Sequence, residues 1–169
     1  RHLPGLWAIC HHHLGDPREA SVAMLGFRDL VRGNLKRFAT DEPFGIQLYA
    51  LLWKHLHDEA EPTGESERVT DIASVLRTTS PLPRLVFLLW AITDLDHGSI
   101  AAMTGVPVDR VRNSCQQLVS RIATSVPQTG VVPDESDAQV RIAEILLAEP
   151  VPQTVHTSWL VEGMSDTTP

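Results

Sequence analysis

Five basic or amide side chains lie close together between residues 110 and 117, and their chemical types suit contact with DNA. Arginines neutralise phosphates, and the amides of asparagine and glutamine read base edges in the major groove. These five side chains are Arg110, Arg112, Asn113, Gln116 and Gln117. A solvated helix face with no ligand is the alternative interpretation, and both stay open at the level of the sequence.

The segment that must position these side chains, from His97 to Ile122, has the layout of a helix-turn-helix. Gly105 stands where the turn between two helices needs a residue that tolerates positive φ. Ala101 stands where the two helices cross closely, and Val111 falls on the inward face of the second helix. An ordinary buried pair of helices is the alternative. The other apolar positions of the pattern are Ile100, Val106 and Cys115, and Pro107 stands at the start of the second helix.

A second cluster with ligand chemistry stands near the start of the chain, where Cys10 precedes three consecutive histidines. In a helix, Cys10 and His13 share a face, whereas His11 and His12 point elsewhere. Two converging ligands fall short of the four that a structural zinc site needs, so the sequence predicts no metal and no cofactor. The GxSxG, GxxxxGK[ST] and HExxH motifs are absent from the sequence, so an enzyme is not expected.

The composition indicates a folded, acidic protein. Of its 169 residues 43% are hydrophobic, and the formal net charge is −7 with a pI near 5.5. This charge argues against a uniformly basic surface but is compatible with a local DNA-binding face. Cys10 and Cys115 form no disulfide framework, and no apolar run approaches the ~20 residues that span a bilayer. We therefore expect a cytoplasmic protein without membrane contact.

Hydrophobic periodicity predicts an all-α protein made of two small helical domains. Residues 1–58 read as a three-helix unit, and residues 59–66 belong to an acidic stretch with Pro, Gly and Ser that is typical of a linker. Residues 67–124 form the helix-turn-helix domain, and residues 125–169 form a tail with one expected helix, over 138–149. The expected helices of the first unit cover residues 3–14, 17–33 and a third stretch that starts near Asp41 or Pro43 and runs to about Asp58. Gly15 is expected to end the first of these helices and Asp16 to cap the second.

Three stretches of the sequence resemble the extracytoplasmic-function sigma factors of the sigma-70 family. Two of them are similar to region 2 of that family, namely GDPREA and FGIQLYALLWKHLHD. The third and more specific match is similar to region 4 and reads PLPRLVFLLWAITDLDHGSIAAMTGVPVDRVRNSCQQL. The resemblance covers about residues 2–123. It implies a region 2-like and a region 4-like unit that bind core RNA polymerase and promoter DNA when transcription starts.

The resemblance also implies further site residues, and the chain departs from the family pattern in two places. In the family the third helix of region 2 faces the melted promoter strand, which implies that Trp53 and Lys54 contact DNA, with Trp53 stacking on an unpaired base. The acidic motif with which the family grips polymerase is missing from the matching stretch SVAMLGFRDLV. SCQQLV stands where the recognition helix usually carries further basic residues, which predicts weaker DNA binding.

These departures favour a second interpretation. The sigma-like domains of PhyR-type anti-anti-sigma regulators bind an anti-sigma factor and need not bind DNA. Similarity to that group is found in HLPGL, QLYALLW and PLPRLVFLL. Two functions are therefore expected as alternatives: a divergent sigma factor that binds polymerase and promoter, or a sigma-like mimic that binds an anti-sigma factor or another regulator.

Overall fold

The regular structure is entirely helical in the computed structural model, which describes residues 2–38, 42–57, 69–132 and 134–160. No strand occurs among these residues, which confirms the all-α prediction. None of the described helices combines the length and apolarity needed to cross a lipid bilayer. In chain order the elements are α1 (Leu3–Leu14), α2 (Pro17–Asn34), the 3-10 turn η1 (Leu35–Arg37), α3 (Phe44–Leu56), α4 (Ile72–Arg77), α5 (Pro81–Ile92), α6 (His97–Thr104), α7 (Val108–Ser125), the 3-10 turn η2 (Pro127–Thr129), α8 (Glu135–Leu147) and α9 (Gln153–Leu160).

Local signals separate the first two helices at the position that the sequence predicts. Gly15 ends α1 in the left-handed conformation, with φ of 79°, and its N–H donates to the carbonyl of His11 at 2.9 Å. The carboxylate of Asp16 then accepts a hydrogen bond of 2.6 Å from the backbone N–H of Arg18. Pro17 opens α2, where a missing N–H costs nothing.

The next two helices begin at caps of different kinds. Pro43 is the cap residue of α3 and one of the two starts that the sequence predicts; the other, Asp41, and the predicted end at Asp58 lie outside the described residues. Helix α4 begins at a capping box in which the carboxylate of Asp71 accepts from the N–H of Ser74 at 2.7 Å. The hydroxyl of Ser74 in turn accepts from the N–H of Asp71 at 3.1 Å. This reciprocal cap allows a helix as short as α4 to form.

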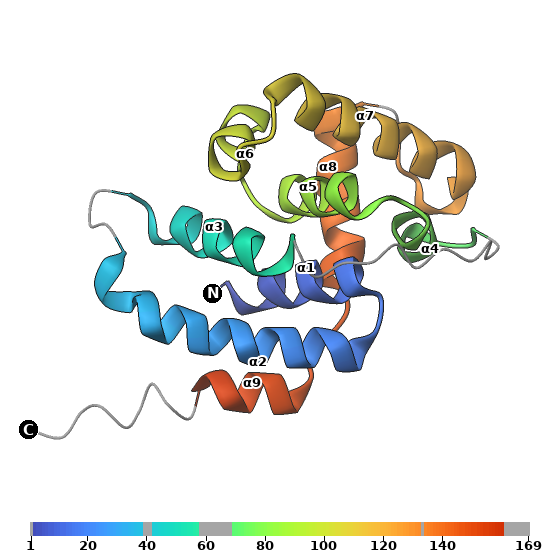
Figure 1. The fold of residues 1–169 in the computed structure, drawn as a ribbon. Helices are drawn as coiled ribbons and strands as arrows, with labels where there is room; N and C mark the ends of the chain where they lie inside the picture. Colours follow the sequence, from blue (N-terminus) through green and yellow to red (C-terminus); the bar gives the residue numbers. More distant parts are fainter. Residues whose placement is uncertain (1, 39–41, 58–68, 133, 161–169) are drawn as a thin grey trace, which may run out of the picture.

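A continuous hydrophobic core runs through both halves of the chain. Helix α1 packs against both α2 and α5 and lies between them in Figure 1. Trp7 and Ile9 of α1 belong to the same core cluster as Phe87 of α5 and Ile122 of α7. The prediction of two separate helical domains is therefore not confirmed, and the predicted linker, residues 59–66, lies outside the described residues.

A buried arginine joins the two halves. Arg84 of α5 is 1% exposed, and its Nη1 donates to the carbonyl of His13, near the end of α1, at 2.6 Å. Its Nη2 donates to the carbonyl of Thr79, just after α4, at 3.0 Å. Burial lowers the pKa of the Arg84 guanidinium. The last carbonyls of α1 have no partner within the helix and form its negative end, so they stabilise this buried cation.

The tail contributes two helices, so the expectation of one was wrong. Helix α8 packs against α5 and α1, and α9 packs against α2 (Figure 1). Helix α9 is too short to form on its own, and contacts distant in the sequence hold it. Val155 is 1% exposed, and the ring centroids of Phe27 and Trp159 lie 6.2 Å apart. A guanidinium nitrogen of Arg28 also donates to the carbonyl of Ser158 at 3.5 Å.

Acid is expected to destabilise the fold through His13, which lies beside Arg84. Burial and then the charge of Arg84 lower the pKa of His13 from 6.5 to about 4. The folded protein keeps this imidazole neutral, whereas the unfolded chain takes up a proton below about pH 6.5. The stability contributed by His13 is therefore complete above that pH and is lost as the pH falls towards 4. A shift of this size corresponds to roughly 3 kcal/mol.

Urea denaturation of the wild type and of His13→Leu between pH 7 and pH 4 measures this contribution. The wild type should lose roughly 3 kcal/mol more of its free energy of unfolding than the variant over this range. The comparison between the two proteins cancels the titration of the carboxylates that they share. Parallel pH profiles for the two proteins would show that His13 does not titrate differently in the folded and unfolded states.

Candidate nucleic-acid interface

The turn between α6 and α7 has the geometry that the sequence predicts. Gly105 ends α6 with φ of 74°, and its N–H donates to the carbonyl of Ala101 at 2.9 Å. At the other end of α6, the carboxylate of Asp96 accepts from the N–H of Ser99 at 2.6 Å. The prediction of a left-handed glycine between two helices is confirmed. Pro107 is the cap residue of α7, directly before its first helical residue, Val108.

The apolar positions of the predicted helix-turn-helix all face inward. Ile100, Val111 and Cys115 are fully buried, and Val106 is buried in the turn. Ala101 is partly buried and packs against the core. Burial raises the pKa of the Cys115 thiol to about 12, so the thiol stays protonated and acts as a small apolar side chain. The inner face of α7 is thus fully used for packing against α5 and its neighbours.

The outer face of α7 carries the side chains predicted to meet DNA. All five of them, at positions 110, 112, 113, 116 and 117, are exposed. They lie within the first three turns of an 18-residue helix, which is about 27 Å long. The structure therefore brings these five residues together on one solvent-facing surface, which we call the α7 outer face: Arg110, Arg112, Asn113, Gln116 and Gln117.

The α7 outer face is only weakly basic. Arg112 lies 3.4 Å from the carboxylate of Asp109, one turn earlier on the helix. Arg121, further along α7, donates to the hydroxyl of Thr78, the residue directly after α4, at 2.8 Å. This bond directs one of its guanidinium nitrogens towards α4. Among the described residues, no ion pair involves Arg110. Two arginines are thus placed to neutralise phosphates near the amides, which is a small number for a DNA-binding helix.

Trp53 and Lys54 of α3 lie in different environments. Trp53 is 6% exposed, and its indole stacks on the ring of His57, with centroids 5.6 Å apart and planes inclined by 9°. The expected role of Trp53 as an open stacking platform is not supported in this conformation, because the indole packs in the core. Lys54 is exposed, so its ammonium group is free to meet a phosphate. The structure does not bring either residue onto the α7 outer face.

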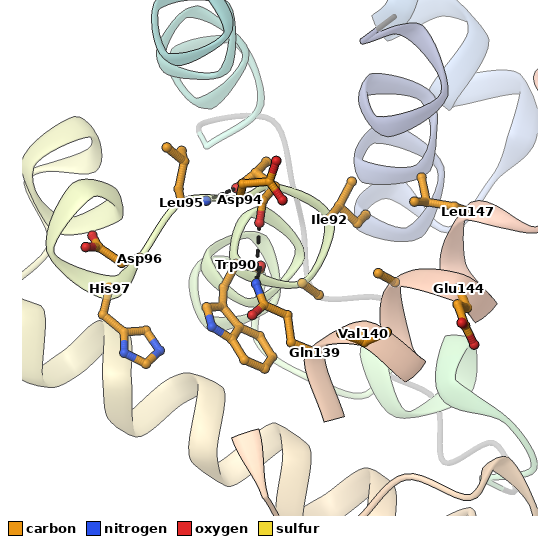
Figure 2. Close-up of a pocket in the computed structure, with 13 residues that line it drawn as sticks. Trp90, Ile92, Asp94, Leu95, Asp96, His97, Gln139, Val140, Glu144 and Leu147 are labelled. Carbon is orange, nitrogen blue, oxygen red and sulfur yellow. Dashed lines mark hydrogen bonds between the residues drawn. The ribbon is translucent and has the colours of Figure 1, made fainter. Parts of the chain in front are cut away.

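A pocket that the sequence did not indicate lies beside the start of α6 (Figure 2). It has a volume of about 680 Å³ and is lined by the end of α5, the following loop and α8. Gln139 of α8 reaches across its base and donates to the carbonyl of Trp90 at 2.7 Å. The ring of His97 stacks on the indole of Trp90, with centroids 6.1 Å apart. The Gln139 bond thus holds α8 against the end of α5, and the ring stack holds the start of α6 against the same part of α5.

A second pocket runs along α2, and we call it the α2 pocket. It has a volume of about 650 Å³, and Val22, which is 71% exposed, lies at its rim. Leu25, also on α2, is 38% exposed. An apolar, concave surface with a few polar groups is typical of contact with another molecule. The remaining lining residues are Leu14, Arg18, Glu19, Ala23, Gly26 and His55.

Comparisons with known protein families, curated proteins and solved structures find no match to this chain. The function is therefore inferred from the geometry of the α7 outer face and the α2 pocket.

Replacing Gly105 tests the turn that orients α7. A Cβ atom at this position meets nothing within 4 Å, so any penalty comes from the positive φ alone. Gly105→Val should lower the free energy of unfolding by roughly 1–2 kcal/mol, and Gly105→Asn should cost less because asparagine tolerates this conformation. Thermal and urea denaturation measure the difference.

Gly33 provides the matched control, because it lies in the last turn of α2 with helical backbone and a Cβ atom added there also meets nothing within 4 Å. Gly33→Ala should stabilise the protein by roughly 0.5–1 kcal/mol, since alanine is the better helix former. Gly105→Ala should act in the opposite direction. A Gly105→Ala variant as stable as the wild type would show that the turn does not require a left-handed residue.

Proposed function

We propose that this chain is a sigma-like regulator of transcription initiation that binds DNA through the α7 outer face. The observation that carries the proposal is the division of α7 into two faces. One face of α7 is buried in the core, and the other presents two arginines and three amides to solvent. The left-handed turn at Gly105 connects α6 to α7. A helix presented in this way fits the major groove, where helix-turn-helix proteins place their second helix.

Each part of the α7 outer face has a distinct role in this proposal. Arg110 and Arg112 bind phosphates and set the register of the helix on the duplex. Asn113, Gln116 and Gln117 contact base edges and provide sequence preference. Because only two arginines contribute, the isolated chain binds DNA weakly. Core RNA polymerase, bound at the same time, supplies the remaining affinity, as the resemblance to sigma factors implies.

A second candidate function is the sigma-like mimic, and the α2 pocket favours it. Val22, which lines this pocket, exposes apolar surface on a helix that lacks the acidic motif of the sigma family. The net charge of −7 disfavours a strong general attraction to DNA. In this function the α2 pocket binds a helix of an anti-sigma factor or another regulator, and α7 does not bind DNA.

DNA binding is tested by selecting bound duplexes from a random-sequence double-stranded DNA library and titrating salt on the enriched sequence. Arg110→Ala and Arg112→Ala should each weaken binding and lower the slope of log K against log salt by about 0.9, the loss of one phosphate contact. Arg141→Ala is the control, because this arginine is exposed on α8 and pairs with Glu144. Equal binding by all three variants, or no enrichment at all, would contradict the α7 assignment.

The mimic is distinguished from the sigma factor by the protein that is recovered with the chain. Val22→Asp places a charge in the α2 pocket and should abolish binding of a small anti-sigma partner while leaving DNA binding unchanged. Affinity capture from the native host, scored for RNA polymerase subunits and for a small anti-sigma protein, measures this. Recovery of RNA polymerase subunits that Val22→Asp leaves unchanged supports the sigma factor and counts against the mimic, whereas recovery of a small anti-sigma protein that Val22→Asp abolishes supports the mimic.

A further inference from the structure

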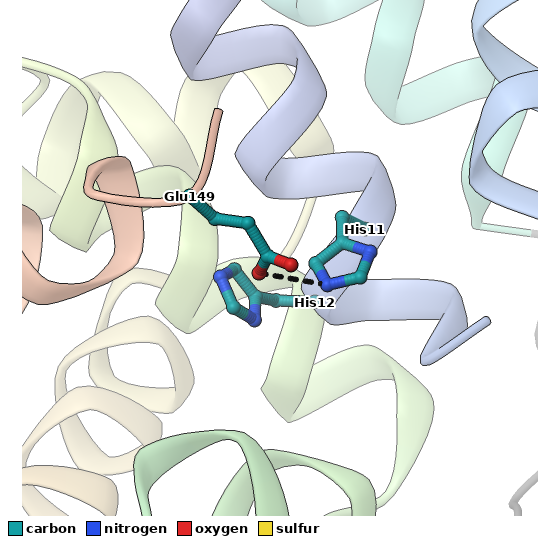
Figure 3. Close-up of side chains that lie close together, drawn as sticks. All are labelled: His11, His12 and Glu149. Atoms are coloured by element: carbon teal, nitrogen blue, oxygen red, sulfur yellow. Dashed lines mark ion pairs between the residues drawn. The ribbon is translucent and has the colours of Figure 1, made fainter. Parts of the chain in front are cut away.

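Three side chains with metal-ligand chemistry converge where the end of α1 meets the segment after α8. His11 and His12 lie in the last turn of α1, and Glu149 follows the end of α8 by two residues. One ligand atom from each lies within 4.8 Å of the other two. Figure 3 shows both imidazoles turned towards the Glu149 carboxylate, with His11 Nε2 at 2.9 Å from its Oε2.

The two histidine rings are held in place by their neighbours. The ring of His11 stacks on the indole of Trp7, with centroids 5.4 Å apart and planes inclined by 16°. His12 is buried, and its Nε2 donates to the carbonyl of Leu146 at 3.3 Å. Histidines that bind metals characteristically donate one ring N–H to a carbonyl or carboxylate, which fixes the ring and leaves the other nitrogen with its lone pair. The fold thus supplies this hydrogen bond for His12, whereas His11 is oriented by stacking on Trp7.

The ion pair joins only His11 to Glu149, yet a ring nitrogen of His12 also lies within 4.8 Å of the same carboxylate group. The rings of His11 and His12 lie 5.0 Å apart. A divalent cation bound between the three side chains would accept a lone pair from each neutral imidazole and would be neutralised in part by the carboxylate. The nitrogen ligands exclude calcium and magnesium, which prefer oxygen, and favour zinc and its neighbours in the first transition row.

The ligand atoms need only a small movement to reach bonding distance. Zinc bonds of ~2.0–2.1 Å at tetrahedral angles place ligand atoms about 3.3 Å apart. Glu149 supplies the adjustment, because its side chain is 46% exposed and stands outside any helix. Two histidines and one glutamate leave the fourth position of a tetrahedral ion to water.

We infer that His11, His12 and Glu149 form a binding site for a divalent transition metal of the zinc class. The bound ion joins α1 to the connection between α8 and α9, and so fastens the tail to the helix at the centre of the core. Because α9 lies on α2, occupancy of this site also stabilises the tail on the α2 surface. The site goes beyond the proposed function and does not depend on it.

Isothermal titration of the EDTA-treated full chain with Zn²⁺ alone tests the site. The wild type should bind one equivalent, and Glu149→Gln should weaken binding by about tenfold or more. His12→Gln should do the same. The matched controls are Glu144→Gln, an exposed glutamate of α8, and His156→Gln, an exposed histidine of α9, and both should bind Zn²⁺ like the wild type.

A second measurement keeps the result independent of folding. Zn²⁺ should raise the melting temperature of the wild type and of both controls, but not that of Glu149→Gln, whose exposed side chain can change without loss of the fold. Co²⁺ bound at this site should show no thiolate charge-transfer band, because Cys10 is not a ligand. No Zn²⁺ binding by the wild type, or binding that survives Glu149→Gln and fails in Cys10→Ser, would overturn the assignment.

Discussion

The guanidinium of Arg84 holds the fold together at the point where its two halves meet. It is buried, and the groups it satisfies are backbone carbonyls at the ends of two other helices, His13 for α1 and Thr79 for α4. A buried carbonyl left without a donor costs roughly 1–3 kcal/mol, so loss of this side chain would leave the buried carbonyl of His13 unsatisfied and remove a part-buried bond to Thr79. The contact fixes α5 against α1, and α5 in turn supports α6, α7 and α8. The outward presentation of α7 therefore depends on a contact that none of the residues of the α7 outer face makes.

Sequence reasoning succeeded where the determining chemistry lies within a few residues. Gly15 with Asp16, and Gly105 with Ala101, are turns whose capping bonds span at most four residues, so their types and spacing were sufficient. The outer face of α7 followed from helical periodicity for the same reason. Gln139 and Glu149 could not be placed, because their partners are fixed only by the packing of α8 against α5 and α1. The separation into two domains failed in the same way, since an acidic stretch says nothing about whether the helices on either side touch.

Trp53 shows how one residue can satisfy two patterns that exclude each other. It stands on the apolar stripe of α3, which predicts burial, and it also matches a helix that faces DNA in the sigma family. The structure follows the stripe, since burial of an indole stabilises a small helical core more than exposure would.

In the proposed zinc site, by contrast, the structure brings together side chains that the helical pattern separates. Consecutive histidines point in different directions on a helix, yet His11 and His12 both reach Glu149 because the carboxylate approaches between them.

The hydrogen bond between His12 and the carbonyl of Leu146 joins residues that are 134 positions apart. During synthesis, α1 therefore leaves the ribosome well before the α8 segment that packs on it. Long-range contacts of this kind form late in folding, because a long stretch of chain must close before they are made. The native packing around α1 is completed only after α8 has left the ribosome, so the ordering of α1 and of α8 is coupled.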